Sequence, residues 1–206
     1  MEFNSYRPHP WHGLSPGDEA PGVVLAYIEI TPFDTVKYEV DKVSGYLKVD
    51  RPQTTSSLPP TLYGFIPQTY CGDATTTLSP IAQIGDGDPL DICVISSSFI
   101  SKSDITLRAK VVGGFQMVDK NEADDKIVGI LDNDPLWGKF EDLTDLPDNL
   151  VSRLKHYFLT YKEPATEGMQ KNPVIIPNVY GKEHAHAVIL AAMKDYREML
   201  SVSNPV

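Results

Sequence analysis

The chain has 206 residues, a length typical of one domain, and we expect a single domain over residues 1–206. Apolar residues make up 41% of it, the share found in proteins that bury a hydrophobic core, which argues against intrinsic disorder. The net charge of −10 argues against general binding to nucleic acid or to an anionic membrane, because like charges repel.

The N-terminal half of the chain predicts strands. Residues 1–22 contain four prolines and little periodicity, which predicts an irregular arm on the surface. Residues 23–30 form a β-branched and aromatic run that predicts a strand. Two further strands, 36–41 and 44–50, are expected to form a hairpin around the DKVSG stretch.

Further strands are expected beyond two loops, at residues 51–62 and 71–85, that are rich in Pro, Ser, Thr, Gly and Asp. The segments with strand texture are DICVIS, TLRAKVVGGFQMVD and KIVGILD. The Gly113–Gly114 pair predicts a bulge or bend in the longest of them.

Two helices are predicted late in the chain. Apolar residues recur at helical spacing from about Pro147 to Lys162 and again from about Glu183 to Leu200. The absence of an alternating βαβ pattern argues against Rossmann and TIM architectures. We therefore predict an α+β, β-rich fold, a small closed or nearly closed barrel with two main helices packed outside.

The strongest chemical signal is GDGDPLD at residues 85–91. Asp86 and Asp88 project the same way in an extended segment, and a bend at Pro89 lets Asp91 rejoin them. Three converging carboxylates repel one another unless cations are present. Ligand sets made only of oxygen select hard ions such as Mg²⁺, Mn²⁺ or Ca²⁺ over zinc.

Asp, Gly and Pro are all common in turns, so a solvated turn is the alternative interpretation of this segment. An EF-hand loop is excluded, because the sixth position counted from Asp86 is Asp91 rather than Gly and the twelfth is Ser97 rather than Glu. A dinucleotide-binding fingerprint is excluded too, because Leu90 stands where its last Gly is needed.

A second acidic set follows the longest predicted strand. Asp119, Asp124 and Asp125 lie beside Lys126 at a turn between strands, where acidic residues usually face solvent only. Together with charged and phenolic residues elsewhere in the chain they form a recognisable pattern. Those residues are Glu29, Lys37, Glu39, Arg51, Tyr63, Tyr161 and Lys162.

In order and approximate spacing, the chain resembles the family I soluble inorganic pyrophosphatases over about residues 23–162. The resemblance is carried by Y-I-E-I, K-Y-E-V-D, V-D-R, Y-G-F-I-P-Q-T-Y, G-D-G-D-P-L-D, D-(x4)-D-D-K-I and H-Y-F-L-T-Y-K. It implies an OB-like barrel that hydrolyses pyrophosphate to two phosphates by direct attack of a metal-bridged water. Three to four Mg²⁺ ions, with Mn²⁺ as a substitute, are implied as cofactors.

The resemblance also implies roles for individual residues. Asp88 corresponds to the general base, and Glu39 to a supporting position. The implied metal ligands are Asp86, Asp91, Asp119, Asp124 and, through water, Glu29. The implied phosphate clamp consists of Lys37, Arg51, Tyr63, Lys126, Tyr161 and Lys162.

The net charge of the predicted site residues supports this assignment independently of the family resemblance. The seven carboxylates among these residues outnumber the four Lys and Arg side chains and leave a charge of about −3, so a pyrophosphate anion needs divalent cations to enter a poorly solvated cleft. Two rival functions fit less well. A nucleotide-sugar transferase with a DxD motif needs a βαβ domain, and a barrel that only binds its ligand would be expected to lack Asp88 or Lys126.

Some positions depart from the family pattern or stay outside it. Pro59 and Leu62 replace a Tyr and an Asn found in many members, which puts one supporting hydroxyl and one amide in doubt. His184 and His186 lie two apart on a predicted helix and diverge, so a shared metal is not expected. The chain length is prokaryotic-type, which favours a homo-oligomer and specifically a hexamer.

The compartment is predicted from several absences. Cys71 and Cys93 have neither CxxC nor zinc-finger spacing and are expected to be buried, reduced thiols. The N-terminus has no basic region followed by an apolar run, and no segment approaches the roughly 18 apolar residues of a membrane span. We therefore expect a cytoplasmic protein without membrane association.

Overall fold

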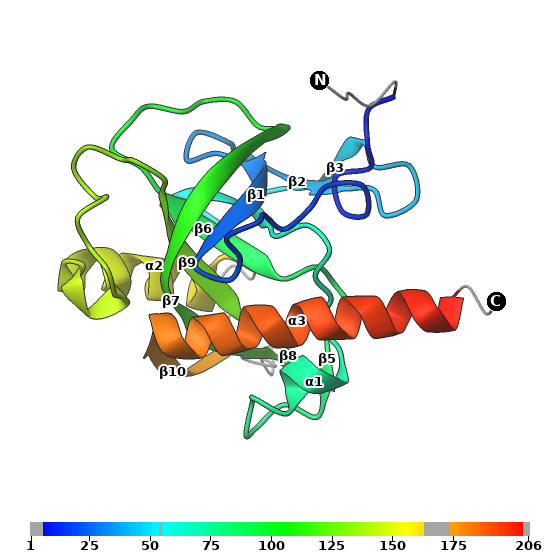
Figure 1. The fold of residues 1–206 in the computed structure, drawn as a ribbon. Coiled ribbons are helices and arrows are strands. Elements are labelled where there is room, and N and C mark those ends of the chain that lie inside the picture. The colour runs from blue at the N-terminus through cyan, green and yellow to red at the C-terminus, as the bar shows by residue number, and fades with distance from the viewer. Residues whose placement is uncertain (1–5, 54, 163–173, 204–206) are drawn as a thin grey trace.

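Five strands of the computed structural model close into a ring (Figure 1). The structure describes residues 6–53, 55–162 and 174–203, so residues 1–5 of the predicted arm lie outside it. The ring runs, in order, through β1 (Val23–Ile30), β4 (Leu62–Phe65), β6 (Asp91–Ile95), β9 (Lys126–Leu131) and β7 (Ile105–Asp119), and β7 pairs with β1 to close it. The predicted small closed barrel is confirmed.

Strand β7 closes the ring because it is long enough to serve several neighbours. Its first half pairs with β1, and its second half pairs with β10 (Ile175–Gly181). Its pairing with β9 shifts register between Val111 and Gly113, where the glycine pair predicted a bulge. A bulge increases the local twist of a strand, which lets β7 curve around the barrel.

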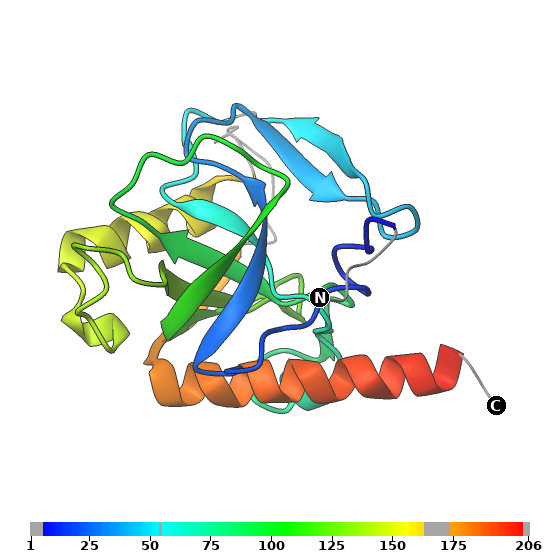
Figure 2. The same cartoon turned by 45° about the horizontal axis from the view of Figure 1, so that its top comes forward.

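The predicted hairpin is confirmed as β2 (Val36–Val40) and β3 (Leu47–Pro52), which form a two-stranded sheet of their own. Figure 2 shows this hairpin standing beside the ring rather than within it. The pairing shifts register between Lys37 and Tyr38. Because the hairpin is not part of the ring, side chains on one of its faces can form a wall of a site.

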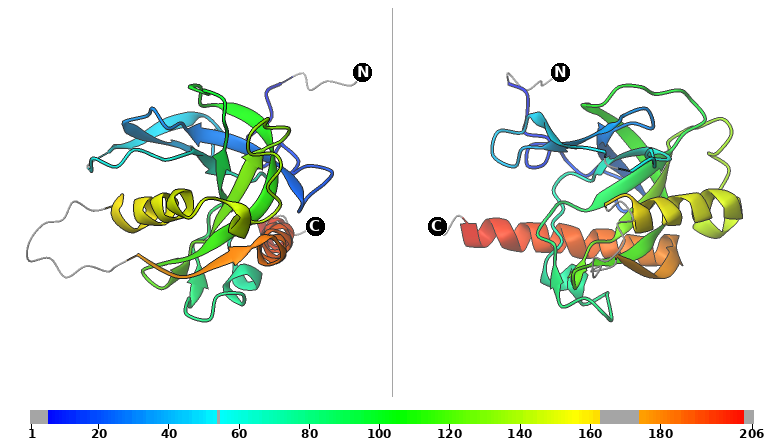
Figure 3. Two further views of the ribbon diagram at one scale, coloured as in Figure 1. Left: turned by 90° about the vertical axis from the view of Figure 1, so that its left-hand side faces the viewer. Right: turned by 180° about the vertical axis from the view of Figure 1, so that it is seen from behind.

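Both predicted helices pack outside the ring (Figure 3). Helix α2 (Asp148–Thr160) buries Leu154 and Phe158 in a cluster with Phe115 of β7. Helix α3 (Lys182–Ser203) buries a stripe with helical spacing against the residues that fill the ring, namely Ala185, Val188, Ile189 and Ala192. Burial of each larger apolar side chain contributes about 1.5–3 kcal/mol.

Four short elements complete the fold. They are α1 (Asp73–Thr76), which lies in the stretch predicted as a loop, the 3₁₀ helix η1 (Leu143–Asp145), and the parallel pair β5 (Ile84–Gly85) and β8 (Glu122–Ala123). Strand β10 was not predicted, because Pro177 interrupts an already short apolar run. None of the helices in the described ranges is apolar enough over sufficient length to cross a bilayer.

The part of the N-terminal arm that the structure describes is irregular, as predicted, and it is firmly attached. Trp11 is buried, and its indole N–H donates to the Thr69 carbonyl at 2.8 Å. The His12 ring nitrogen Nδ1 lies 2.8 Å from the Tyr196 hydroxyl on α3. The arm therefore connects helix α3 to the segment that follows β4.

Candidate active site

A pocket of about 220 Å³ lies on the outer face of the ring, between the end of α2 and the β2–β3 hairpin. Strand periodicity explains its position. Cys93 and Ile95 of β6 pack in the cluster beneath α2, so Asp91, two residues earlier, faces the same side beyond the end of the helix. Lys126 precedes Val128 and Ile130 of β9 in the same way.

Every site residue predicted from the sequence lines this pocket. They come from β1, the hairpin, β4, the acidic segment, the turn after β7, β9 and the end of α2, and they are Glu29, Lys37, Glu39, Arg51, Tyr63, Asp86, Asp88, Asp91, Asp119, Asp124, Lys126, Tyr161 and Lys162. The tertiary structure thus gathers residues separated by more than half of the chain into one place.

Lys126 lies at the centre of the pocket floor and is 1% exposed. Its ammonium group donates to the carboxylates of Asp91 and Asp124, and the Tyr63 hydroxyl donates to Asp91 at 2.5 Å. Burial lowers the pKa of Lys126, but the charges of Asp124 and Asp91 outweigh it and hold the pKa well above its usual value. The lysine therefore stays charged and offsets part of the buried negative charge.

The positive charge of Lys126 does not balance the negative charge of the carboxyl groups in the pocket, and their pKa values are raised. Burial, followed by the charge of Asp124, raises the pKa of Asp86 to about 9. Burial raises the pKa of Asp91 as well, although Lys126 opposes that shift. Burial raises the pKa of Glu29 to about 8, although its carboxylate accepts the Val40 N–H at 2.7 Å. Such groups ionise at neutral pH only when more positive charge is supplied.

Divalent cations fit this donor set chemically. The acidic residues offer only oxygen ligands and exceed the basic ones, which suits hard ions. In the part of the chain that the structure describes, no three Asp, Glu, His or Cys side chains are grouped to hold an ion as they stand. Lysines stand between the acids instead, since Lys162 Nζ lies 2.5 Å from Asp119 and 3.7 Å from Asp124.

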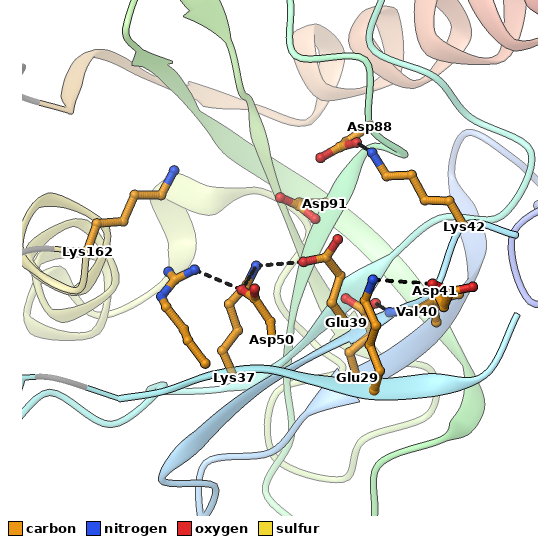
Figure 4. Close-up of polar contacts among 12 residues, drawn as sticks. Glu29, Lys37, Glu39, Val40, Asp41, Lys42, Asp50, Asp88, Asp91 and Lys162 are labelled. Atoms are coloured by element: carbon orange, nitrogen blue, oxygen red, sulfur yellow. Dashed lines mark hydrogen bonds and ion pairs between the residues drawn. The ribbon is translucent and has the colours of Figure 1, made fainter. Parts of the chain in front are cut away.

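The hairpin contributes a linked set of charges to the opposite wall (Figure 4). Lys37 Nζ lies 3.2 Å from Glu39 and 2.9 Å from Asp50, and the Arg51 guanidinium lies 2.8 Å from Asp50. Burial lowers the pKa of Lys37, but its bonds to Asp50 and Glu39 raise it further, so the net pKa is above its usual value. Asp50 thereby holds Lys37 and Arg51 beside the pocket.

Sequence reasoning missed several residues of the pocket. Lys42, in the hairpin turn, forms an ion pair with Asp88 across the pocket mouth (Figure 4), and Glu122 of β8 and Trp11 of the arm line the pocket. The only sequence signal for Lys42 was its place in the predicted hairpin near Lys37. Its contact with Asp88 joins positions 46 apart in the chain.

Other residues considered from the sequence lie elsewhere. Leu62 points into the core rather than the pocket, so its departure from the family pattern removes no pocket-lining side chain. His184 packs on the Tyr180 ring, and neither it nor His186 lines the pocket. Asp125 accepts a hydrogen bond from the Tyr180 hydroxyl at 2.8 Å behind the site, and burial raises its pKa to about 6.

Comparisons with known proteins agree with this geometry. A family model described as inorganic pyrophosphatase matches residues 26–197. The chain is 44% identical over 195 residues to an inorganic pyrophosphatase of Chlamydia muridarum, covering 91% of this chain and 93% of that protein. It is 35% identical over 190 residues to soluble inorganic pyrophosphatase 2 of Chlamydomonas reinhardtii, covering 92% and 89% of the two chains.

A solved structure gives the same result for the fold. The crystal structure of inorganic pyrophosphatase from Thermus thermophilus superimposes with a TM-score of 0.76 at 30% identity, covering 92% of this chain and 99% of that one. The long sequence matches, the shared barrel and the pocket that gathers the predicted residues lead to one conclusion. The chain belongs to the inorganic pyrophosphatase family.

Proposed function

We propose that this chain hydrolyses inorganic pyrophosphate to two phosphates in the pocket beside the hairpin. The observation that carries the proposal is one pocket in which four Lys and Arg side chains of the predicted clamp stand among an excess of carboxylates. Cationic side chains suit the oxygens of a polyanion, and surplus carboxylates suit divalent ions that accompany it. Family membership supports the same substrate.

The residues that would hold divalent cations are Asp86, Asp91, Asp119 and Asp124, with Glu29 further back. We propose Mg²⁺, with Mn²⁺ as a substitute. When bound, such ions supply positive charge to the phosphate oxygens and lower the pKa of water. Lys126 remains beneath Asp91 and Asp124 and keeps part of their charge balanced.

The clamp residues position the substrate. Lys37 and Arg51 approach from the hairpin, Lys126 from the floor and Lys162 from the end of α2, so a diphosphate among them meets cations on several sides. Tyr63 and Tyr161 offer hydroxyl groups nearby. These cationic side chains would stabilise charge on the leaving phosphate once divalent ions replace Lys162 beside Asp119 and Asp124.

Asp88 is proposed as the general base. Its side chain is 44% exposed at the pocket mouth, where water can reach it, and its backbone N–H is bonded to the Asp86 carboxylate at 3.0 Å. A carboxylate in this place accepts a proton from the attacking water, and the proton leaves through the mouth. Lys42 holds Asp88 beside the pocket in the absence of substrate.

Phosphate release by the purified chain tests this function. We expect rapid release from pyrophosphate with Mg²⁺, almost none with EDTA, and little from ATP as the competing substrate. Failure to release phosphate with either Mg²⁺ or Mn²⁺, from a sample shown to be folded, would rule out the proposed reaction.

Mg²⁺ binding is expected to release at least one proton at pH 7. Without a cation the pKa of Asp86 is about 9, so this carboxyl group holds a proton that it must lose on coordination. In the unfolded chain the Asp86 carboxyl group has its ordinary pKa of 3.8. Between about pH 4 and pH 9 the cation-free folded chain therefore binds one proton more than the unfolded chain, and its free energy of unfolding falls as pH rises through this range. Calorimetric titrations in two buffers of different ionisation heat count the proton. Binding heats that do not depend on the buffer would contradict the prediction.

A further inference from the structure

The backbone of the acidic segment, residues 85–91, is bound to the irregular stretch around Cys71. The Cys71 N–H donates to the Asp88 carbonyl at 2.9 Å, and the Gly87 N–H donates to the Cys71 carbonyl at 3.1 Å. A Cβ atom at Gly85 would lie 2.1 Å from the Cys71 oxygen, so the two backbones are in direct contact. The position of Cys71 therefore determines the position of Asp86 and Asp88.

Helix α3 holds the other side of this stretch through Asp195. Asp195 is 4% exposed and does not line the pocket, and its carboxylate accepts three backbone N–H groups. These come from Gly72 at 3.0 Å, Ala74 at 2.8 Å and Thr75 at 2.9 Å, and the Thr75 hydroxyl adds a fourth bond at 3.1 Å. Figure 1 shows α1 directly against α3 at this point.

These contacts form a short, continuous connection. Asp195 binds the N–H of Gly72, and Gly72 adjoins Cys71, which is bonded on both sides to Gly87 and Asp88. The Tyr70 N–H also donates to the Ala192 carbonyl of α3 at 3.0 Å, one turn before Asp195. Asp195 also binds Ala74 and Thr75 of α1, at the start of the segment that leads from Cys71 to Gly85.

We propose that Asp195 is a positioning residue that keeps the acidic segment in its cation-binding arrangement. The inference rests on the proposed function, because it assigns Asp86 and Asp91 to cations. Removing the carboxylate leaves the buried Thr75 N–H and the partly buried Gly72 and Ala74 N–H groups without their acceptor, so the stretch from Gly72 to Thr75 shifts to find new partners. A displacement of Cys71 then moves the backbone of Gly87 and Asp88 with it.

The test compares Asp195→Ala with Asp142→Ala. Asp142 is a matched control because it also accepts backbone N–H groups, from Lys182 at the start of α3 at 2.8 Å and from Thr144 of η1 at 3.1 Å, and it does not line the pocket. Mg²⁺ alone is titrated into each protein by calorimetry. We expect Asp195→Ala to weaken Mg²⁺ binding about 10-fold, and Asp142→Ala to leave it unchanged.

Amide hydrogen exchange provides a second readout that needs no cation. In Asp195→Ala the amides of Cys71 and Gly87 should exchange faster than in wild type, whereas in Asp142→Ala they should not. Asp195→Asn keeps one acceptor oxygen and should show a smaller effect in both measurements. If the alanine variant fails to fold, the asparagine variant decides the question.

Unchanged Mg²⁺ affinity and unchanged exchange at Cys71 and Gly87 in a folded Asp195 variant would overturn the proposal. Equal weakening by Asp142→Ala would overturn it too, because the effect would then be general destabilisation. Neither measurement uses pyrophosphate. If wild type releases no phosphate but the Asp195 variants still weaken Mg²⁺ binding, the proposed function fails and the positioning role stands.

Discussion

Asp88→Asn is expected to lower the turnover of pyrophosphate by about 10²- to 10⁴-fold. The amide cannot accept the proton of the attacking water, while its size matches that of the carboxylate. Because the Asp88 side chain is half-exposed and its charged partner is the equally exposed Lys42, the fold loses little. Turnover at saturating pyrophosphate and Mg²⁺, together with a thermal unfolding curve, measures both effects.

Asp132→Asn is the matched control for this substitution. Asp132 is also a partly exposed carboxylate with one cationic partner, Arg108 at 2.9 Å, but it lies outside the pocket. Its amide variant should keep wild-type turnover. Turnover of Asp88→Asn within a few-fold of wild type would exclude Asp88 as the base.

Lys126→Met is expected to destabilise the cation-free protein by about 3–5 kcal/mol. The methionine fills most of the lysine volume, so packing is nearly preserved. What is lost is the ammonium group between Asp91 and Asp124, so Asp91 loses its ion-pair partner and Asp124 keeps only Lys162 at 3.7 Å. Urea unfolding in EDTA measures the loss. Adding Mg²⁺ should reduce it, because a cation replaces part of the missing charge.

Lys162→Met serves as the comparison. Lys162 pairs with Asp119 at 2.5 Å, but its side chain is 32% exposed against 2% for Lys126, so its ammonium group is already partly solvated and screened by water. We expect a loss of about 1 kcal/mol or less. Similar losses for the two variants would show that the burial of Lys126 does not govern its contribution.

Much of the fold followed from local patterns. The run at β1, the hairpin and the stripes of α2 and α3 were predicted because strand and helix periodicities are properties of neighbouring residues. Strand β10 escaped prediction because Pro177 breaks its pattern and its pairing with the second half of β7 stabilises it from a distance. The predicted single domain, hexamer and cytoplasmic location stay predictions.

The spacing of the acidic and basic residues determined, by itself, the chemistry available to this protein. Carboxylates two residues apart share a face of an extended chain whatever surrounds them, and their repulsion already required cations. Only the tertiary structure decided which charges meet. Three contacts depend on how the ring, the hairpin and the helices pack: Lys42 with Asp88, Lys126 with Asp124 in the buried pocket floor, and Asp195 with Gly72. Local sequence determines which groups a segment carries, whereas the folded core determines which of them lose water and which partner replaces it.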